Sequence, residues 1–217
     1  MRDSIDDDFQ LATPDLKNQT RLPENLVVEL RSIIEPLHLA ELFPQARPLE
    51  VELGCGDASF LVEYAQRHPD RNFIGVERLL GRLRKLDRKG RRAGLTNLRG
   101  ARIESAYFLQ YLLPPRSASV LHIYFPDPWP KKKHHKYRLI NGPFPEIVRT
   151  ALAPGGVVYF RTDNEDYFGQ MTGVFGANTE FQKIETPSEL AELSTDFEQE
   201  FQARGIQTLR AAYQIKL

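Results

Sequence analysis

The sequence LEVELGCG, residues 49–56, gives the strongest indication of the fold. Its first five residues have the short, largely apolar character of a buried strand, and two glycines follow. Glycine lets the backbone turn tightly and approach a ligand closely. A strand that ends in such a turn is typical of an open α/β sheet, where ligands bind at the carboxyl ends of the strands.

Strand-like and helix-like segments alternate from this motif onward. The expected strands cover residues 49–53, 72–76, 97–102, 119–125 and 157–161. The expected helices cover residues 58–67, 79–94, 106–112, 143–152 and about 165–175, and the fourth is expected to stop at Pro154-Gly155-Gly156. This alternation predicts an α/β fold with a mostly parallel sheet and helices on both faces.

Two further strands are expected near the C-terminus, at residues 181–185 and 208–216. The acidic stretch between them looks irregular, and no helix is expected there. Without a helix to cross over the sheet, one of the two strands should be inserted antiparallel at an edge. The prediction is therefore a seven-stranded, mostly parallel sheet with one antiparallel edge strand.

The N-terminal region is expected to contain a leader and one helix. Residues 1–20 have few apolar groups and read as a flexible acidic leader. Apolar residues recur at helical spacing between Leu26 and Leu37, which predicts a helix from Pro23 to about Leu42. Residues 21–217 would then form a single domain, as the length of 217 residues suggests.

The composition is that of an ordinary soluble protein, with 41% hydrophobic and 27% charged residues. No apolar run is long enough to cross a membrane, the start lacks a secretory signal, and the single cysteine excludes an internal disulfide. These features predict a cytoplasmic protein. The net charge is zero, but basic residues gather at 78–102 and 131–138, where they present either a positive face or merely a solvated surface.

Carboxylates stand at the ends of the first two expected strands of the alternating region. Glu77 is suited to the hydroxyls of a ribose, which NAD and S-adenosylmethionine both carry. A dinucleotide fingerprint needs a third glycine where this chain has Ser59. Glu52 would repel a pyrophosphate but favours the cationic S-adenosylmethionine. Glu52, Gly54, Gly56 and Glu77 are therefore expected to bind S-adenosylmethionine.

A proline-rich and then basic segment follows the expected strand 119–125, and it reads PDPWPKKKHHKYR from residue 126. The prolines stiffen the loop, so that it can hold Asp127 and Trp129 at the edge of the sheet. The basic residues after them can neutralise phosphates, which indicates a nucleobase with phosphates as substrate. His134 and His135 lack further ligands at metal-site spacing, so no metal is expected.

These motifs resemble the bacterial tRNA (guanine-N7-)-methyltransferase family over about residues 48–217. The resemblance is carried by ELGCG from Glu52, IGVE ending at Glu77, YFPDPWPK from Tyr124, RTDN from Arg161 and TDFE from Thr195. It implies a Rossmann-like class I methyltransferase fold. It also implies transfer of a methyl group from S-adenosylmethionine to N7 of a guanosine in the variable loop of tRNA, at position 46 of the tRNA, by a monomer or homodimer.

The resemblance also implies roles for particular residues. Asp127 would be catalytic and would contact the cofactor region together with Glu52 and Glu77. Glu104 stands where the family usually has Asp or Asn as an adenine contact, and it is assigned to the cofactor on that ground. The substrate would be held by Lys131, Asp163, Thr195, Asp196, Phe197 and Glu198.

The chemistry of guanine indicates how such a site works. N7 carries an in-plane lone pair and no proton, so positioning and electrostatics replace a general base. Asp127 or Asp163 is suited to accept the guanine N–H groups, and Trp129 is suited to stack on the base. One alternative is an adenine amino-group methyltransferase acting on nucleic acid. Another is a module that binds cofactor or RNA without turnover, which the acidic residues along the sheet edge disfavour.

Overall fold

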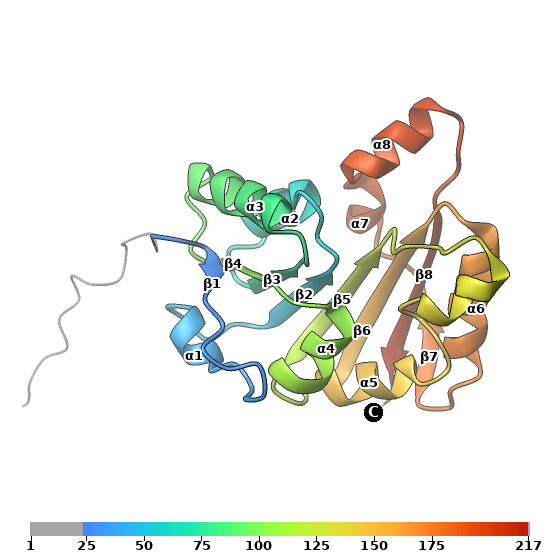
Figure 1. The fold of residues 1–217 in the computed structure, drawn as a ribbon, viewed down its shortest axis with the longest axis horizontal. Coiled ribbons are helices and arrows are strands. Elements are labelled where there is room, and N and C mark those ends of the chain that lie inside the picture. The colour runs from blue at the N-terminus through green and yellow to red at the C-terminus, as the bar shows by residue number, and fades with distance from the viewer. Residues whose placement is uncertain (1–23, 217) are drawn as a thin grey trace, which may run out of the picture.

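The computed structural model describes residues 24–216, and it builds them around one β-sheet (Figure 1). The strands are β1 (Val27–Val28), β2 (Leu49–Leu53), β3 (Asn72–Val76), β4 (Leu98–Ala101), β5 (Ala118–Tyr124), β6 (Leu152–Thr162), β7 (Phe181–Ile184) and β8 (Leu209–Ile215). Their order in the sheet is β1-β4-β3-β2-β5-β6-β8-β7. Strands β1 to β6 pair in parallel, and β8 is antiparallel to β6 and β7. The expected α/β fold is confirmed, whereas the expected leader, residues 1–20, lies outside the described residues.

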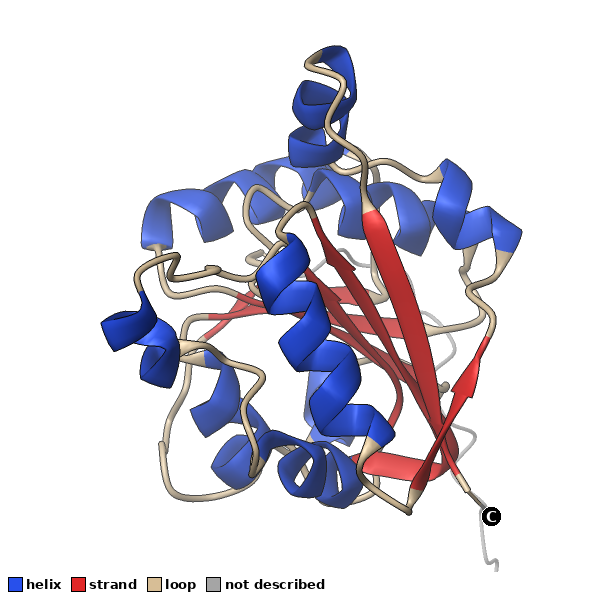
Figure 2. Cartoon of the chain, turned by 90° about the vertical axis from the view of Figure 1, so that its right-hand side faces the viewer, coloured by secondary structure: helices blue, strands red, loops and turns tan. Residues whose placement is uncertain are grey.

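Helices cover both faces of this sheet (Figure 2). They are α1 (Leu39–Leu42), α2 (Ser59–Arg67), α3 (Leu80–Arg92), α4 (Ser105–Tyr107) continued by a π-helical turn (Phe108–Leu112), a 3-10 helix (Lys132–Tyr137), α5 (Phe144–Ala151), α6 (Glu165–Gly176), α7 (Ser188–Glu192) and α8 (Asp196–Ala203). Helices α2 and α3 pack on one face through residues such as Leu61 and Leu83. Helices α5 and α6 pack on the other through residues such as Phe144 and Phe175. Because both faces are covered, every residue of β2 and β3 is buried.

The prediction of an N-terminal helix from Pro23 to about Leu42 is wrong. The chain forms the short strand β1, then irregular backbone, and only the helix α1. The backbone N–H of Leu26 donates to Asp87 Oδ1 on α3 at 2.8 Å, and Val27 pairs with Gly100 of β4. Pro36 lacks the N–H that a continuous helix needs. These contacts add an eighth strand to the expected seven.

Two other expectations also need correction. Pro154-Gly155-Gly156 does not separate a helix from a strand, because β6 runs through it from Leu152 to Thr162. The register of β5 against β6 shifts between Ala118 and Val120 to accommodate the irregularity. Two helices, α7 and α8, lie between β7 and β8, where no helix was expected. The insertion of β8 antiparallel to the rest of the sheet is confirmed.

The parallel strands end at one edge of the sheet, and their final residues lead directly into the motifs identified from the sequence. Gly54 follows β2, Glu77 follows β3, Phe125 follows β5 and Asp163 follows β6. The α7–α8 insert (residues 188–203) contributes Thr195 and Phe201 to a cavity at this same edge. The carboxyl edge is therefore where the chemistry of the chain is concentrated.

Candidate active site

The loop after β2 turns through the left-handed backbone region three times. The φ angles are 80° at Gly54, 54° at Gly56 and 60° at Ala58. The backbone N–H groups of Gly54 and Cys55 both donate to the carbonyl of Val76, which fastens the loop to the end of β3. No atom lies within 4 Å of an added Cβ at either glycine, so their φ angles, and not lack of space, favour glycine there.

Glu52 is a buried carboxylate with an uncompensated oxygen. Its side chain is 4% exposed, and Oε2 has no hydrogen-bond partner among the described residues. Burial raises the pKa of Glu52 to about 8, even though the nearby Arg161 guanidinium opposes the shift. A buried acceptor left unpaired is costly unless a ligand satisfies it. A ligand cation would both pair with Glu52 and restore its charge.

Cys55 lies beside Glu52 and is not suited to act as a nucleophile. The thiol is buried, and burial raises its pKa, with the carboxylates of Glu52 and Glu77 adding to the effect. A thiol that stays protonated is unreactive. Its sulfur packs against Gly75, where an added Cβ would lie only 2.8 Å from Cys55 Sγ. Cys55 therefore has a packing role in the loop.

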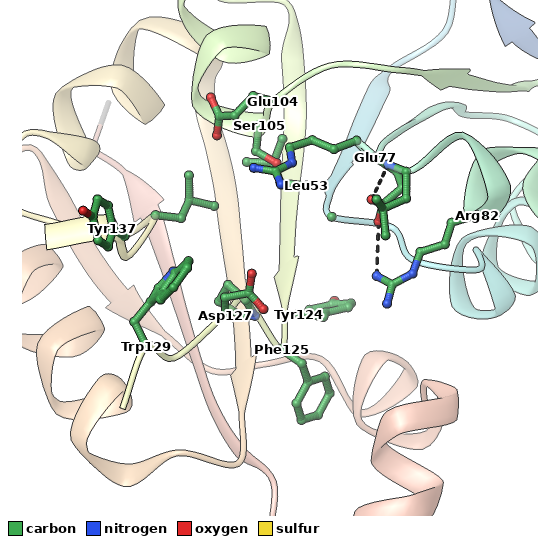
Figure 3. Close-up of a pocket in the computed structure, with 15 residues that line it drawn as sticks. Leu53, Glu77, Arg82, Glu104, Ser105, Tyr124, Phe125, Asp127, Trp129 and Tyr137 are labelled. Carbon is green, nitrogen blue, oxygen red and sulfur yellow. Dashed lines mark hydrogen bonds and ion pairs between the residues drawn. The ribbon is translucent and has the colours of Figure 1, made fainter. Parts of the chain in front are cut away.

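Glu77 ends β3 with its carboxylate in a second cavity (Figure 3). Oε1 accepts the backbone N–H of Leu79 at 2.9 Å, and Oε2 lies 3.5 Å from Nη1 of Arg82. These two contacts orient the carboxylate but leave further acceptor positions on both oxygens. The group is therefore held in place and is still able to accept hydrogen bonds from a ligand.

Glu104 lines the same cavity but is engaged locally. It is the N-cap of α4, and its two oxygens accept the backbone N–H groups of Ala106 at 3.0 Å and Tyr107 at 2.8 Å. Such capping fixes the start of the helix at the rim of the cavity. The contact between Glu104 and an adenine stays a prediction.

Asp127 borders both cavities at the carboxyl edge. The cavity of about 410 Å³ holds Glu77 and Glu104, and the cavity of about 290 Å³ holds Glu52 and Asp163. Residues shared by the two are Gly54, Arg82, Tyr124, Phe125, Pro126 and Asp127. Figure 3 shows Asp127 between the aromatic pair Trp129 and Tyr137 on one side and Glu77 with Arg82 on the other. The two cavities are thus neighbours, and one carboxylate faces both.

The loop that carries Asp127 is held in an unusual conformation. Phe125 and Trp129 have φ angles of 49° and 44°, values that bulky side chains rarely adopt. Arg138 stabilises the loop, because its Nε donates to the carbonyl of Pro128 at 2.7 Å and its Nη2 lies 2.5 Å from Asp166. Arg138 is 2% exposed, so its inclusion among the phosphate-binding residues of the basic segment is wrong.

A cluster of aromatic side chains lies at the opening of the larger of the two cavities. The rings of Trp129 and Tyr137 lie 5.3 Å apart at 55°, and the ring of His134 lies 5.9 Å from that of Trp129. Trp129 is 37% exposed and Tyr137 is 57% exposed. Exposed aromatic faces beside a carboxylate offer a surface on which a flat base can stack.

The residues assigned to the substrate do not all meet at one place. Asp163 and Thr195 line the smaller cavity, whereas Lys131 is exposed and lines neither of the two cavities. Thr195 and Glu198 form a capping box at the start of α8. The side chains of Asp196 and Phe197 lie outside the described part of the structure. Contact of all these residues with substrate stays a prediction.

Arg161 is a central residue of this edge to which the sequence analysis gave no role. Its guanidinium is fully buried, donates to the carbonyls of Leu190 and Leu193, and lies 2.9 Å from Glu198. Glu198 is also buried and pairs with Arg210. The signal in the sequence is a charged residue at the end of the apolar run 157–160, since buried charges need partners. The network fastens the α7–α8 insert to β6 and β8.

Residues 24–216 contain no helix of the length and apolarity that a membrane span requires. No group of three or more His, Cys, Asp or Glu side chains in the described residues is arranged to hold a metal ion.

The fold is that of the class I S-adenosylmethionine-dependent methyltransferases. The fold is shared with the 16S rRNA methyltransferase KamB, with a TM-score of 0.58 and 18% identity over 89% of this chain and 100% of that chain. The aminoglycoside resistance methyltransferase NpmB1 gives a TM-score of 0.55 at 17% identity, over 82% of this chain and 92% of that chain. A family model described as "Putative methyltransferase" matches residues 46–211.

Curated sequences identify the family more closely. The tRNA (guanine-N(7)-)-methyltransferase of Sodalis glossinidius is 35% identical over 176 residues, which are 79% of this chain and 74% of that protein. The enzyme of the same name from Chromohalobacter salexigens is 43% identical over 136 residues, 63% of this chain and 55% of that protein. The match with the Aeromonas hydrophila relative covers 60% of its length. The chain belongs to the tRNA (guanine-N(7)-)-methyltransferase family.

Proposed function

We propose that this protein transfers the methyl group of S-adenosylmethionine to N7 of a guanosine in tRNA. The observation that carries the proposal is the position of Asp127, which borders the cavity of Glu77 and the cavity of Glu52 and Asp163. A carboxylate placed there can face the cofactor and the base at once. The names of the curated relatives support the choice of base and of RNA.

The residues at the carboxyl edge fit S-adenosylmethionine. The unpaired, buried Oε2 of Glu52 suits the cationic part of the cofactor, and its pKa of about 8 would fall as the cation binds. The carboxylate of Glu77, held by Leu79 and Arg82, suits the ribose hydroxyls. When bound, the cofactor supplies an electrophilic methyl group on a positively charged sulfur.

Methyl transfer to N7 of guanine requires little from the protein beyond placing the base correctly. Glu52 and Glu77 would hold the cofactor, which would supply its methyl group to the in-plane lone pair of N7 and keep on sulfur the electron pair of the broken carbon–sulfur bond. No proton moves, so Asp127 and Asp163 act as hydrogen-bond acceptors for N1–H and N2–H and not as bases. The methylated base carries a positive charge, which a nearby carboxylate stabilises as it develops.

The rest of the tRNA contacts residues around the opening of the active-site cavity. The exposed faces of Trp129 and Tyr137 are suited to receive an unstacked base, as exposed aromatic side chains do in other RNA-binding proteins. The lysines of residues 131–136 follow directly and can contact phosphates on either side of that base. An accessible guanosine in the variable loop of tRNA is the proposed target. The proposed place of action is the cytoplasm, and the proposed form is a monomer or homodimer.

The deciding experiment identifies the product. Bulk tRNA without N7-methylguanosine is incubated with the protein and S-adenosylmethionine carrying a labelled methyl group. The methylated nucleoside is identified by chromatography and mass spectrometry against standards, and its position is mapped on oligonucleotides from a partial digest. N7-methylguanosine in the variable loop supports the proposal. A methylated adenosine would favour the adenine amino-group alternative, and tRNA binding without any methylated nucleoside would favour a binding module.

A further inference from the structure

Helix α3 carries a dense, outward-facing positive charge. Its sequence, LGRLRKLDRKGRR, has seven basic residues and one acidic residue in 13 positions. Leu83, Leu86 and Gly90 are buried against the sheet. Since these three positions face inward at helical spacing, the basic residues point to solvent. The exposed ones are Arg82, Arg84, Lys85, Arg88, Arg91 and Arg92.

Few acidic groups offset this charge. Lys89 pairs with Asp57 at 2.6 Å, Arg82 lies 3.5 Å from Glu77, and Arg91 lies 4.0 Å from Asp87. In the described part of the chain, no carboxylate lies within ion-pair distance of Arg84, Lys85 or Arg88. We use the name "basic ridge" for these three residues.

The residues of the basic ridge stand at repulsive spacing from one another and from other basic residues of α3. Arg84 and Arg88 stand four positions apart, as do Arg88 and Arg92, and Lys85 and Lys89. Like charges at this spacing repel each other on a helix surface. A stable helix in a protein of zero net charge does not require such an arrangement. The charge is instead suited to an anionic partner, whose binding would relieve the repulsion.

The position of α3 connects the basic ridge to the active site. Arg78 and Leu79, which lead into the helix, line the 410 Å³ cavity together with Arg82, Asp127 and Trp129. From that rim the helix extends away for about 20 Å, at about 1.5 Å per residue over its 13 residues. The lysines of 131–136 lie in the chain between Trp129 and Tyr137, and Figure 3 shows these two aromatic residues on the side of the cavity opposite Glu77 and Arg82.

We propose that the basic ridge is a second binding surface for the phosphate backbone of the same RNA whose base enters the cavity. The inference rests on the proposed function, because that function supplies a polyanion long enough to reach both sides of the cavity. The lysines at 131–136 hold the backbone on the Trp129 side, and the basic ridge holds it on the Glu77 side. Phosphate contacts of this kind set position and affinity without reading sequence.

An anionic membrane is the other macromolecular partner that such charge could attract. Helices that bind membranes expose an apolar face beside the basic one. Of the three leucines of α3, Leu83 and Leu86 are fully buried against the sheet, and Leu80 in the first turn is half-buried. The observations therefore favour RNA, and binding to lipid becomes an outcome of the test.

The test compares two triple variants of the full-length protein. The first changes Arg84, Lys85 and Arg88 to Ala. The matched control changes Arg47, Arg149 and Lys183 to Ala, which removes the same charge from positions outside both cavities. Binding of unmodified tRNA is measured across a salt series, binding of S-adenosylmethionine by calorimetry, and binding to phosphatidylcholine vesicles with and without phosphatidylglycerol by sedimentation.

The basic-ridge variant should bind tRNA at least tenfold more weakly than the control at low salt. Its slope of log affinity against log salt should be flatter by about two to three units, since each phosphate contact contributes about 0.7 to 0.9. S-adenosylmethionine affinity should match the control, because none of the three residues lines either cavity.

Equal tRNA affinity and slope in the two triple variants would overturn the inference, as would a wild-type protein that does not bind tRNA. Loss of phosphatidylglycerol binding with unchanged tRNA binding would overturn it in favour of a membrane surface. These readouts do not depend on methyl transfer. A wrong methylated nucleoside therefore counts against the proposed function and leaves the binding comparison intact.

Discussion

The guanidinium of Arg161 lies 4.1 Å from the centroid of the Tyr124 ring. Tyr124 lines both cavities, and Arg161 also holds the buried carboxylate of Glu198 at 2.9 Å. One buried cation therefore links the wall of the active site to the α7–α8 insert. A cation over an aromatic face is attracted by the negative face of the ring, and the attraction is strongest when water is excluded.

Replacing Arg161 with Met should destabilise the protein strongly. Glu198 is fully buried and, among the described residues, would keep Arg210 as its one ion-pair partner. Breaking a buried ion pair from one side costs about 3–5 kcal/mol, which at this chain length lowers Tm by roughly 6–20 °C. Thermal unfolding followed by circular dichroism measures the change. The double variant R161M/E198Q should recover part of the loss, and a double variant no more stable than R161M would contradict this explanation.

Asp127→Ala should nearly abolish methyl transfer while the fold persists. The side chain is exposed at the junction of the two cavities, so its loss leaves no buried gap. Turnover with saturating tRNA and cofactor should fall well beyond tenfold, the equivalent of about 1.4 kcal/mol in the barrier. Asp70→Ala, a change to an exposed carboxylate away from the site, is the control. Turnover of D127A within tenfold of D70A would show that Asp127 has no part in the reaction.

Glu77→Ala should weaken S-adenosylmethionine binding far more than tRNA binding. The carboxylate is oriented by Leu79 and Arg82 toward the cavity, and lost hydrogen bonds to a charged group cost about 1.5 to 3 kcal/mol. That corresponds to roughly 10- to 150-fold in Kd. Calorimetry on E77A and on Glu63→Ala, an exposed carboxylate of α2, provides the comparison. Equal cofactor affinity in the two variants would remove Glu77 from the cofactor site.

The sequence was sufficient to predict most of the sheet, because β2, β3 and β4 are buried along their whole length, and glycine follows β2 and a carboxylate follows β3. The N-terminal error has a specific cause. Val27 and Leu30 fit a helical period as well as a strand, and the contact from Leu26 to Asp87 on α3, which holds the strand, spans 61 residues. Local pattern carries no information on such a contact.

The same limit applies to the active site. The placement of Glu52, Glu77 and Asp127 at one edge was predictable, because the strand ends of a parallel sheet meet there, and their roles stay predictions. Arg138 was misread as a phosphate ligand, since it turns back to the carbonyl of Pro128 in its own loop and pairs with Asp166, 28 residues further along the chain on α6. The sequence alone indicates that a basic residue within a basic run is exposed, because it does not show the groups with which that residue pairs.

Cofactor binding should release a proton between pH 6 and 8. Burial raises the pKa of Glu52 to about 8, so the free protein holds a proton there at pH 7. The cofactor's positive charge lowers that pKa, and the proton leaves as the cation binds. Affinity should therefore rise with pH and level off above about 8. Because the folded pKa is raised, the stability contribution of Glu52 is present below its ordinary pKa of 4.5 and is lost as the pH rises through about 8.

Calorimetry in buffers of different ionisation enthalpy counts the released protons. The variant Glu52→Gln has no titrating group at this position, so its proton release reports the titration of the cofactor alone. This value is subtracted from the proton release of the wild type. The wild type should release up to about one proton more than E52Q at pH 7. Identical proton release in the two proteins would mean that Glu52 does not pair with the cofactor's cation.

The lysines after the Asp127 loop should control how tRNA binding depends on salt. Lys132 and Lys133 are exposed on the 3-10 helix and line neither cavity. Changing both to Ala should flatten the slope of log affinity against log salt by up to about two units. S-adenosylmethionine affinity should stay constant. The matched control replaces Arg149 and Lys183, which removes two charges far from the site.

Lys131 should behave differently from its neighbours. It lies closest to the Asp127 loop, and the family resemblance assigns it to the substrate. Lys131→Ala should therefore lower turnover even when tRNA is saturating, whereas the Lys132/Lys133 double variant should act through tRNA affinity. Salt series and saturation kinetics on the same preparations separate the two effects.

A salt slope in the Lys132/Lys133 double variant equal to that of the Arg149/Lys183 control would mean that Lys132 and Lys133 are only solvated. The phosphate contacts would then fall to the basic ridge of α3 alone, and the triple variant at Arg84, Lys85 and Arg88 should lose nearly all of the salt dependence.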